Sequence, residues 1–540
     1  MGRSAGSEQP ASQQGSDVVL VSMPFGPLFQ PSMGLSLLKP AIAQLGVTTK
    51  LLYFTFRFAE LIGASSYLQI SEGQPASYDL VGEWIFSAAL FGNASSDAEG
   101  YIEEVLGKHL AAHEYMKPVS EAFLRSIIEA RAKAESFLGE CQHSVTKRAP
   151  RIVGFTSVFQ QQVASLALAR RIKAQNPETF IVFGGANCEG IMGIEVLRQF
   201  PFVDAVISGE GDLIFPELVR NVLQGEPLSG LQGVYTRDGT LSVCTKTCYT
   251  NAPLVCDLDT LPYPDYDDFF EQLGASRLDS LRAPRIPFET SRGCWWGEQA
   301  HCTFCGLNGA TMVYRSKSCT RAVEELVYLS TKYPGYDISA VDNIMNMKYF
   351  KDFIPELVTR RLGVQLFYEV KANLKKWQVQ LLRQAGVTTI QPGIESLSTQ
   401  VLKLMRKGVR AIENIQLLKW CKELGIRPFW NIIWGFPGEG PEEYASMADL
   451  IPLLAHLQPP ESAAAIRLDR FSPNFECSEQ LGFSDVAAYP AYRYIYPLEP
   501  AAVANLAYYF TFKYSSPQDV ARYTESVVKS IASWKEVSET

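Results

Sequence analysis

The sequence predicts an α/β protein with an N-terminal doubly wound domain, a partial (β/α)6 barrel and a mainly helical C-terminal region. Short apolar segments alternate with amphipathic segments of helical period over residues 17–229 and again over 286–475. Such alternation is typical of parallel sheets covered by helices. Residues 230–285 between them are rich in proline and predict a connector, and residues 476–540 contain two further helical patterns.

The N-terminal domain is predicted to begin after residues 1–16, a polar tail that buries too little apolar surface to become ordered. The expected strands are 17–23, 47–56, 151–155, 180–183 and 204–208, and the expected helices are 35–45, 162–175 and 193–200. In a doubly wound domain, ligands bind at the carboxyl ends of the strands.

Small polar residues and glycines follow three of these strands. They are Thr156, Ser157, Gln160, Gly184, Gly185, Ala186, Gly209 and Glu210. Glycines let a large flat or phosphorylated ligand approach the backbone closely. The same residues also suit the ordinary tight turns of an α/β fold, so spacing alone leaves both interpretations open.

A long insertion at residues 64–150 interrupts this domain with helical stretches at 98–113 and 119–139. Insertions of this length in compact domains usually have a function. Two interpretations are open: a cap or peptide-docking surface, and plain packing on the sheet edge. His109 and His113 are four residues apart, but no third ligand accompanies them, so we predict no metal there.

The connector contains a hairpin signal at Arg237-Asp238-Gly239 and an extended proline-rich stretch at 258–266. The barrel strands are expected at 286–290, 337–342, 365–369, 389–393, 427–434 and 465–469, with helices at 320–332, 349–361, 376–385, 411–424 and 441–457. A barrel of this size is open on one side and places its active site at the carboxyl ends of its strands. The last helices are expected at 500–508 and 517–534.

Three cysteines directly after the first barrel strand have C-x7-C-x2-C spacing: Cys294, Cys302 and Cys305. Three thiolates can hold three irons of a [4Fe–4S] cluster and leave the fourth iron open. An open iron can chelate the amino and carboxylate groups of S-adenosylmethionine (SAM). The alternative is a structural zinc site with His301, which the lack of a second ligand pair disfavours. Cys244 and Cys248 fall in a probable strand and are interpreted as structural.

This loop, with Phe304 before the last cysteine, resembles the radical SAM superfamily, whose usual spacing is C-x3-C-x2-C. The sequence motifs GCWWG and HCTFCGLNG resemble those of one branch of this superfamily, the class B cobalamin-dependent enzymes that mature ribosomally synthesised peptides (RiPPs). The resemblance implies that the strand-end residues of the N-terminal domain bind cobalamin. That domain has no D-x-H-x-x-G histidine, so the resemblance implies a cobalt without a histidine ligand from it.

The resemblance also implies a SAM site at the carboxyl ends of the barrel strands. Phe304 would flank the adenine, and the polar groups would come from Asp342, Asn343, Glu369, Lys371, Glu395 and Ser396. Each strand end alone also suits an ordinary strand-to-helix turn. Their placement on successive strands favours a binding site.

These cofactors together imply methylation of an unactivated sp3 carbon in a residue of a precursor peptide. One alternative keeps the cofactors but gives a non-methylating radical modification, such as epimerisation, cyclisation or rearrangement. A second alternative is a non-catalytic cobalamin-binding protein with a structural metal. The expected partners are the precursor peptide and an electron donor such as flavodoxin or ferredoxin.

Composition excludes several other classes. A net charge of −8 and a pI near 5.5 argue against nucleic-acid binding. No apolar run is long enough to span a membrane, and no signal peptide is recognisable. We therefore expect a cytoplasmic protein whose cysteines are thiols or metal ligands.

Overall fold

The computed structural model describes residues 15–92, 97–107, 119–237, 249–309 and 311–539. Most of the predicted tail, His109, His113, the turn residues Asp238 and Gly239, and the pair Cys244 and Cys248 lie outside these ranges. No helix in the described ranges combines the length and apolarity needed to cross a membrane.

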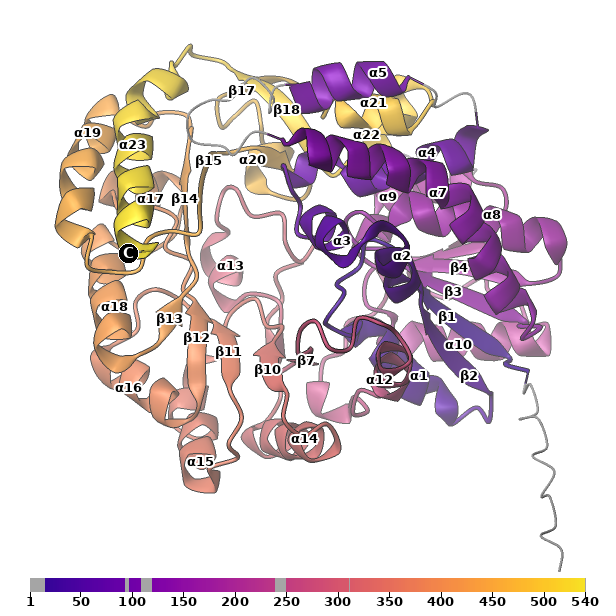
Figure 1. Ribbon diagram of the computed structural model, residues 1–540. Helices are drawn as coiled ribbons and strands as arrows, with labels where there is room; N and C mark the ends of the chain where they lie inside the picture. The colour runs from indigo at the N-terminus through magenta and orange to yellow at the C-terminus, as the bar shows by residue number, and fades with distance from the viewer. Residues whose placement is uncertain (1–14, 93–96, 108–118, 238–248, 310, 540) are drawn as a thin grey trace, which may run out of the picture.

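The N-terminal domain contains a six-stranded sheet in the order β2-β1-β3-β4-β5-β6, with helices on both faces (Figure 1). Its strands are β1 (Val18–Ser22), β2 (Thr49–Tyr53), β3 (Ile152–Thr156), β4 (Phe180–Gly184), β5 (Ala205–Ile207) and β6 (Val234–Thr236). The first five are parallel, and β6 pairs antiparallel with β5. This is a flavodoxin-like order, whose ligand site is expected at the switch point between β1 and β3.

Helices α1 (Met33–Ala43), α8 (Gln162–Gln175) and α9 (Ile191–Gln199) lie within two residues of the predicted bounds, and α10 (Gly211–Gln224), which was not predicted, continues the alternation. Two other features differ from the prediction. The second strand ends at Tyr53, and the apolar residues after it begin α2 (Phe54–Ile62), because a short apolar run does not distinguish a strand from a buried helix. Strand β6, expected in the connector, is instead an edge strand of this sheet.

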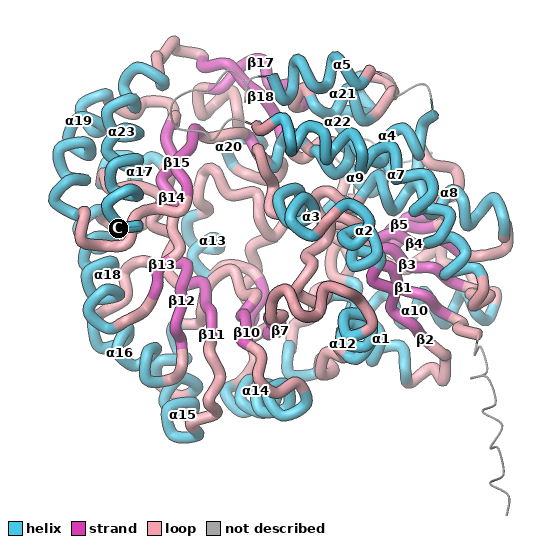
Figure 2. The backbone as a smooth tube through the Cα atoms, in the orientation of Figure 1, coloured by secondary structure: helices cyan, strands magenta, loops and turns pink. Residues whose placement is uncertain are grey.

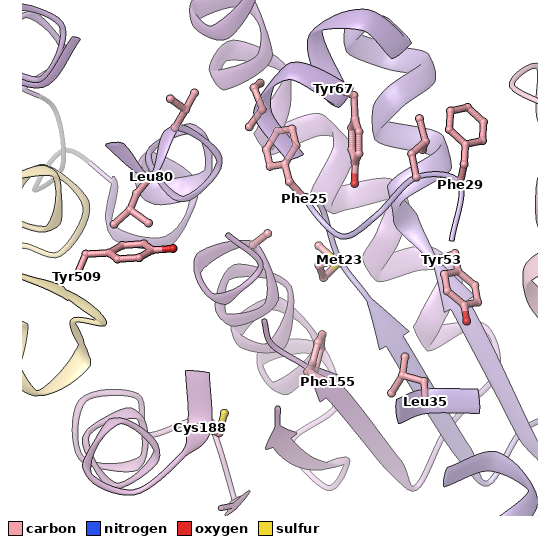
Figure 3. Packing of buried hydrophobic residues seen from close by; sticks show 14 of the residues in the cluster. Met23, Phe25, Phe29, Leu35, Tyr53, Tyr67, Leu80, Phe155, Cys188 and Tyr509 are labelled. Carbon is pink, nitrogen blue, oxygen red and sulfur yellow. The ribbon is translucent and has the colours of Figure 1, made fainter. Parts of the chain in front are cut away.

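The insertion forms a helical layer made of α3 (Ala64–Ser71), η1 (Ser77–Asp79), α4 (Val81–Phe91), α5 (Ala98–Gly100), the π-helix η3 (Tyr101–Leu106) and α7 (Glu121–Thr146). Helix α4 is buried on nearly all sides and packs against α7 and α8. Phe25, which follows β1, packs against Tyr67 of α3 with ring centroids 5.0 Å apart (Figure 3). The described part of the insertion therefore packs on helix α8 of the domain and on the segment that follows β1.

The second half of the predicted connector also packs on the N-terminal domain. It contains η5 (Leu258–Thr260) and α12 (Asp267–Gly274). Asp268 of α12 pairs with Lys39 and Lys50 at 2.7 Å each, and the Gln272 side chain accepts a hydrogen bond from the Tyr53 amide. These contacts fix the point from which the chain enters the barrel.

The partial barrel has the expected parallel strands (Figure 2). They are β7 (Arg285–Phe288), β10 (Asp337–Ala340), β11 (Leu366–Glu369), β12 (Val387–Gln391), β13 (Arg427–Pro428), β14 (Asn431–Trp434) and β15 (Ser462–Ala465). One bridge between Glu395 and Ile432 links β14 and β15 to the rest. Among the described residues, β7 pairs only with β10 and β15 only with β14, so the barrel is open between its first and last strands.

The barrel helices are α14 (Cys319–Lys332), α15 (Phe353–Arg360), α16 (Lys376–Gln384), α17 (Thr399–Leu404), α18 (Ala411–Leu424) and α19 (Pro441–Leu450), with η6 (Met347–Phe350) and η7 (Ile451–Leu454) beside them. Helix α17 was not predicted. The strand interpreted as 465–469 is split, because β15 ends at Ala465 and β16 (Leu468–Asp469) pairs with a different sheet.

Most of the secondary structure of the C-terminal region is helical, as predicted, but the region also contributes two strands that the sequence did not predict. Strands β17 (Phe483–Ala488) and β18 (Tyr509–Tyr514) join β16 in an antiparallel sheet with the order β16-β18-β17. Helices α20 (Pro473–Glu476), α21 (Ala491–Ile495), α22 (Pro500–Leu506) and α23 (Val520–Glu539) accompany it. Helix α23 packs along α19 on the flank of the barrel, and the Trp534 indole donates to the Leu457 carbonyl at 3.0 Å.

Candidate active site between the two domains

A cavity of about 640 Å³ lies between the carboxyl ends of the N-terminal strands and the cysteine loop at the mouth of the barrel. The N-terminal domain, the barrel, the insertion and the C-terminal region all contribute to its wall. Among the lining residues are Gln160, Gly185, Ala186, Gly209, Gly293, Gly306, Asn308, Asn343, Ser77, Leu80, Tyr492, Tyr508 and Tyr509. The two sets of strand-end loops singled out in the sequence therefore meet at one cavity.

A second cavity of about 340 Å³ continues from the first into the N-terminal domain, where it forms a slot. The two cavities share Gly185, Gly209, Glu289, Arg292 and Val341. Leu35 and Phe155, both labelled in Figure 3, line the slot, as does Thr156 at the end of β3. The slot lies at the switch point of the sheet, where a doubly wound fold binds its ligand.

Two neighbouring glycines at the end of β4 have different roles. A Cβ on Gly184 would meet no atom within 4 Å, so this residue borders open space in the slot. A Cβ on Gly185 would lie 2.6 Å from the Ser157 carbonyl oxygen, and its φ of +98° is one that L residues rarely adopt. Gly185 is required by the turn itself, whereas Gly184 keeps the slot open.

Two of the residues expected to bind cobalamin, Ser157 and Gln160, make contacts within the protein. Ser157 is fully buried behind the turn and hydrogen-bonds to Gln162 and Asn187. The Gln160 side chain accepts from the Gly82 amide at 2.6 Å and donates to the Ile70 carbonyl, which ties the insertion to the cavity wall. Ser157 shapes the turn and lines neither cavity, and its expected contact with cobalamin stays a prediction.

Glu210, also expected to contact cobalamin, belongs to an ionic cluster between the domains. Arg292 of β8 (Ser291–Arg292) pairs with Asp212 at 2.7 Å, Glu289 at 2.8 Å and Glu210 at 3.3 Å. Arg315 of β9 (Arg315–Ser316) pairs with Glu210 at 2.8 Å. Because Glu210 and Asp212 follow β5 while Glu289 follows β7, this cluster joins the two sheets across the cavity.

We expect the Arg292→Met variant to lose about 3 kcal/mol of unfolding free energy, because Glu289 and Asp212 would keep mostly buried charges without their partner. Denaturant unfolding of the cofactor-free protein, followed by tryptophan fluorescence, measures this loss. The control is Arg360→Met, whose exposed pair with Glu356 should contribute less than about 1 kcal/mol. Equal losses in the two variants would contradict a structural role for the cluster.

Hydrogen bonds hold the cysteine loop to two different segments at the barrel mouth. Helix α13 (Trp295–Ala300) occupies the wide spacing between Cys294 and Cys302. The Trp295 indole donates to the Met345 carbonyl at 3.1 Å, and the Trp296 indole donates to the Arg406 carbonyl at 3.0 Å. The additional residues of the C-x7-C spacing therefore anchor the loop to the segments that follow β10 and α17.

The arrangement of the three cysteines fits a [4Fe–4S] cluster better than a zinc ion. Burial raises the pKa of Cys305 to about 12, and the neighbouring thiols of Cys302 and Cys294 add to the shift, so the three lie close together. Each of the three thiolates of such a cluster binds a different iron. The His301 Nε2 atom is already hydrogen-bonded to the Cys305 carbonyl oxygen at 2.8 Å.

Two lysines, the buried Lys371 and the half-buried Lys407, lie beside these thiols. Lys407, which sequence reasoning missed, is 3.2 Å from Glu395, and its Nζ is 5.5 Å from the centre of the Phe304 ring. Burial opposes the charge of Lys407, but Glu395 and Cys302 outweigh it and raise its pKa. Lys371 donates to the Lys407 carbonyl at 2.7 Å, and its Nζ lies 3.4 Å from the centre of a Trp296 ring. Both cations can compensate the negative charge of thiolates, a cluster or a carboxylate.

The residues expected to bind SAM fall into two groups. The first group lies near the cysteines and consists of Phe304, Glu369, Lys371 and Glu395. Lys407 interacts electrostatically with Glu369, Glu395 and Cys302. Asn343 lines the large cavity. Burial raises the pKa of Glu369 to about 8, and Asp342 adds to this shift. Asp342 and Ser396 are fully buried.

Asp342 and Ser396 form hydrogen bonds within the protein at the carboxyl ends of the barrel strands. Asp342 accepts from the Thr290 amide at 2.7 Å and from the hydroxyls of Thr290 and Ser291, which ties the end of β10 to the end of β7. Ser396 accepts from the Ser398 amide before α17. Each side chain therefore shapes a strand-end turn, and the expected contacts of Asp342 and Ser396 with SAM stay predictions.

Comparison with known proteins agrees with this geometry. Residues 288–451 match the family model of the radical SAM superfamily. An uncharacterized methyltransferase of Pyrococcus horikoshii is 27% identical over 307 residues, which cover 55% of this chain and 63% of that protein. The anaerobic magnesium-protoporphyrin IX monomethyl ester cyclase of Rubrivivax gelatinosus is 25% identical, covering 56% of this chain and 54% of its own length. The chain thus spans less than two thirds of either relative.

Two solved structures share the fold over nearly the whole chain. One is the radical SAM methyltransferase TsrM of Kitasatospora setae, with a TM-score of 0.59, 16% identity and coverage of 96% of this chain and 89% of that chain. The other is the cobalamin-dependent SAM radical enzyme OxsB, with a TM-score of 0.60, 14% identity and coverage of 97% and 67%. Residues 288–451 therefore match the radical SAM superfamily, and nearly the whole chain shares its fold with known cobalamin-dependent radical SAM enzymes.

Proposed function

We propose that this enzyme is a cobalamin-dependent radical SAM C-methyltransferase that acts on an unactivated sp3 carbon of a residue in a ribosomally synthesised precursor peptide. The observation that carries this proposal is the shared cavity. It brings the loop of Cys294, Cys302 and Cys305 to the glycine-lined strand ends of the doubly wound domain. An enzyme that uses two cofactors on one carbon must hold both against the same space.

The residues present fit these cofactors. Cys294, Cys302 and Cys305 would hold the cluster, and Glu395 and Lys407 offer charges of opposite sign to the amino and carboxylate groups of SAM. The slot beside Gly184 and Gly209 would take part of the cobalamin. When bound, these cofactors supply a 5′-deoxyadenosyl radical and a transferable methyl group. The protein positions them and excludes water.

The substrate side of the cavity is formed by the insertion and the C-terminal region. Tyr492, Tyr508 and Tyr509 line it, and Arg467 is held there by Asp469 at 2.7 Å and by the Ser77 hydroxyl at 3.3 Å. A peptide substrate is supported by the resemblance of the cysteine loop to the RiPP-maturing branch and by the open side of the barrel. TsrM, described with bound tryptophan, shows that an amino acid can occupy this fold. We place the reaction in the cytoplasm, where thiols stay reduced.

The test uses the reconstituted, reduced enzyme with cobalamin, the precursor peptide and SAM that carries a deuterated methyl group. We expect each product peptide to gain one labelled methyl group, with 5′-deoxyadenosine and S-adenosylhomocysteine formed in equal amounts. One SAM supplies the radical and another the methyl group. Mass spectrometry of the peptide and chromatography of the nucleosides give both results.

The two alternatives predict different outcomes of this experiment. The similarity to a cyclase favours testing a non-methylating radical reaction. In that case 5′-deoxyadenosine accumulates while the peptide gains no label. A non-catalytic cobalamin-binding protein would form neither nucleoside, which would contradict both enzymatic proposals.

A further inference from the structure

Reductive cleavage of SAM requires an electron, and a cluster held near the surface must receive it from another protein. We propose that a surface beside the cysteine loop binds an acidic, low-potential one-electron carrier. This carrier-docking face consists of Lys375, Trp377, Lys403, Arg406 and Ile412. The proposal rests on the cluster of the proposed function.

The charge of this face is opposite to that of the whole protein. The chain has a net charge of −8, yet Lys375, Lys403 and Arg406 are all exposed here. In the described ranges none of these three has an ion-pair partner, whereas the adjacent Lys376 and Arg410 pair with Glu423 and Glu413. Uncompensated cations steer an acidic partner and set its orientation.

The same face also carries exposed apolar side chains. Trp377 is 56% exposed in the first turn of α16, and Ile412 is 50% exposed in the first turn of α18. These two helices pack against each other on the outside of the barrel (Figure 1). Protein interfaces are enriched in tryptophan and arginine, which often contribute most of the binding energy. The face therefore has the composition of a protein-binding surface.

The carrier-docking face is connected to the cysteine loop by the segment that contains Met405 and Arg406. The Arg406 carbonyl accepts the Trp296 indole N–H, and the Met405 carbonyl accepts the Thr303 amide at 3.1 Å. Thr303 directly follows Cys302. A carrier seated here would therefore lie beside a segment that is hydrogen-bonded directly to the cysteine loop.

The transfer itself balances with one electron and no bond change. A reduced carrier, such as a flavin hydroquinone that becomes a semiquinone, gives one electron to the oxidised [4Fe–4S] cluster. The rate of carrier oxidation can therefore be measured without SAM or peptide. It reports docking independently of methyl transfer.

The test compares Lys375→Glu/Lys403→Glu with the matched control Lys419→Glu/Lys422→Glu, which changes two exposed lysines of α18 by the same charge. Stopped-flow absorbance follows the oxidation of a reduced acidic flavodoxin by each reconstituted holoenzyme. We expect the face variant to be slower by about tenfold or more at low ionic strength, with the difference shrinking at high salt. The control should match the wild type. Dithionite-driven formation of 5′-deoxyadenosine should be unchanged in both.

Equal oxidation rates in the face variant and the wild type would overturn the proposal. So would weaker binding of the precursor peptide to the face variant with an unchanged carrier rate, because the surface would then belong to the peptide. If the double variant fails to retain its cluster, Lys375→Gln and Lys403→Gln decide the question. Each should slow carrier oxidation on the order of threefold, and unchanged rates would again overturn the proposal.

Discussion

Replacing Cys294, Cys302 and Cys305 together with alanine is expected to abolish the visible iron–sulfur absorption and all formation of 5′-deoxyadenosine. The three thiols are the only cysteines on the loop that α13 and the two indole bonds hold at the barrel mouth. Cobalamin binding should persist, because the slot lies in the other domain. Iron and sulfide analysis after reconstitution measures the loss.

The control for this experiment is Cys256→Ala/Cys319→Ala, which removes two free cysteines outside the loop. We expect it to retain wild-type iron and sulfide. If the triple variant retains its iron, the cluster has other ligands and the assignment fails. A wild-type protein that binds one zinc ion and no iron would instead favour the structural metal site.

The fold was predictable wherever the sequence pattern is local. The bounds expected for α8 and α18 agree with the structure, because each helix ends at a local stop signal: Asn176-Pro177 follows α8, and Gly425 follows α18. The C-terminal sheet was missed because β17 contains serine, aspartate and alanine, which favour strands weakly. Its partner β18 lies beyond two intervening helices, so only the tertiary fold reveals the pairing.

In the candidate site, too, some features have a local sequence pattern and others appear only in the folded protein. Cysteine spacing and strand-end glycines are visible along the chain, and the loops that carry them line one cavity in the structure. The contact of Arg292 with Asp212 joins residues 80 positions apart and had no sequence signal. Lys407 follows an unpredicted helix, and only folding brings it to Glu395. Gly184 and Gly185 look equivalent in sequence, yet only the backbone geometry shows which of them borders the slot.

This difference between the two glycines gives the sharpest test of cobalamin binding. The Gly184→Leu variant should weaken cobalamin binding by at least about 30-fold, equivalent to ~2 kcal/mol, because the new side chain enters the slot. The fold should tolerate this leucine, since Gly184 ends β4 without a left-handed φ and its Cβ would meet no atom within 4 Å. Gly185→Leu would be uninformative, because its Cβ would collide with the Ser157 carbonyl whether or not a ligand binds.

Titration of cobalamin into the cluster-reconstituted Gly184→Leu protein, with bound corrinoid measured by absorbance after desalting, gives the affinity. The matched control is Gly274→Leu, which adds the same side chain at an exposed position at the end of α12 where the space is also open. This control should bind cobalamin like the wild type, and both variants should keep the full iron content. Wild-type affinity in Gly184→Leu would show that cobalamin does not occupy the slot. In that case the glycine-lined strand ends would be ordinary turns of the α/β fold, and cobalamin would have to bind elsewhere in the cavity.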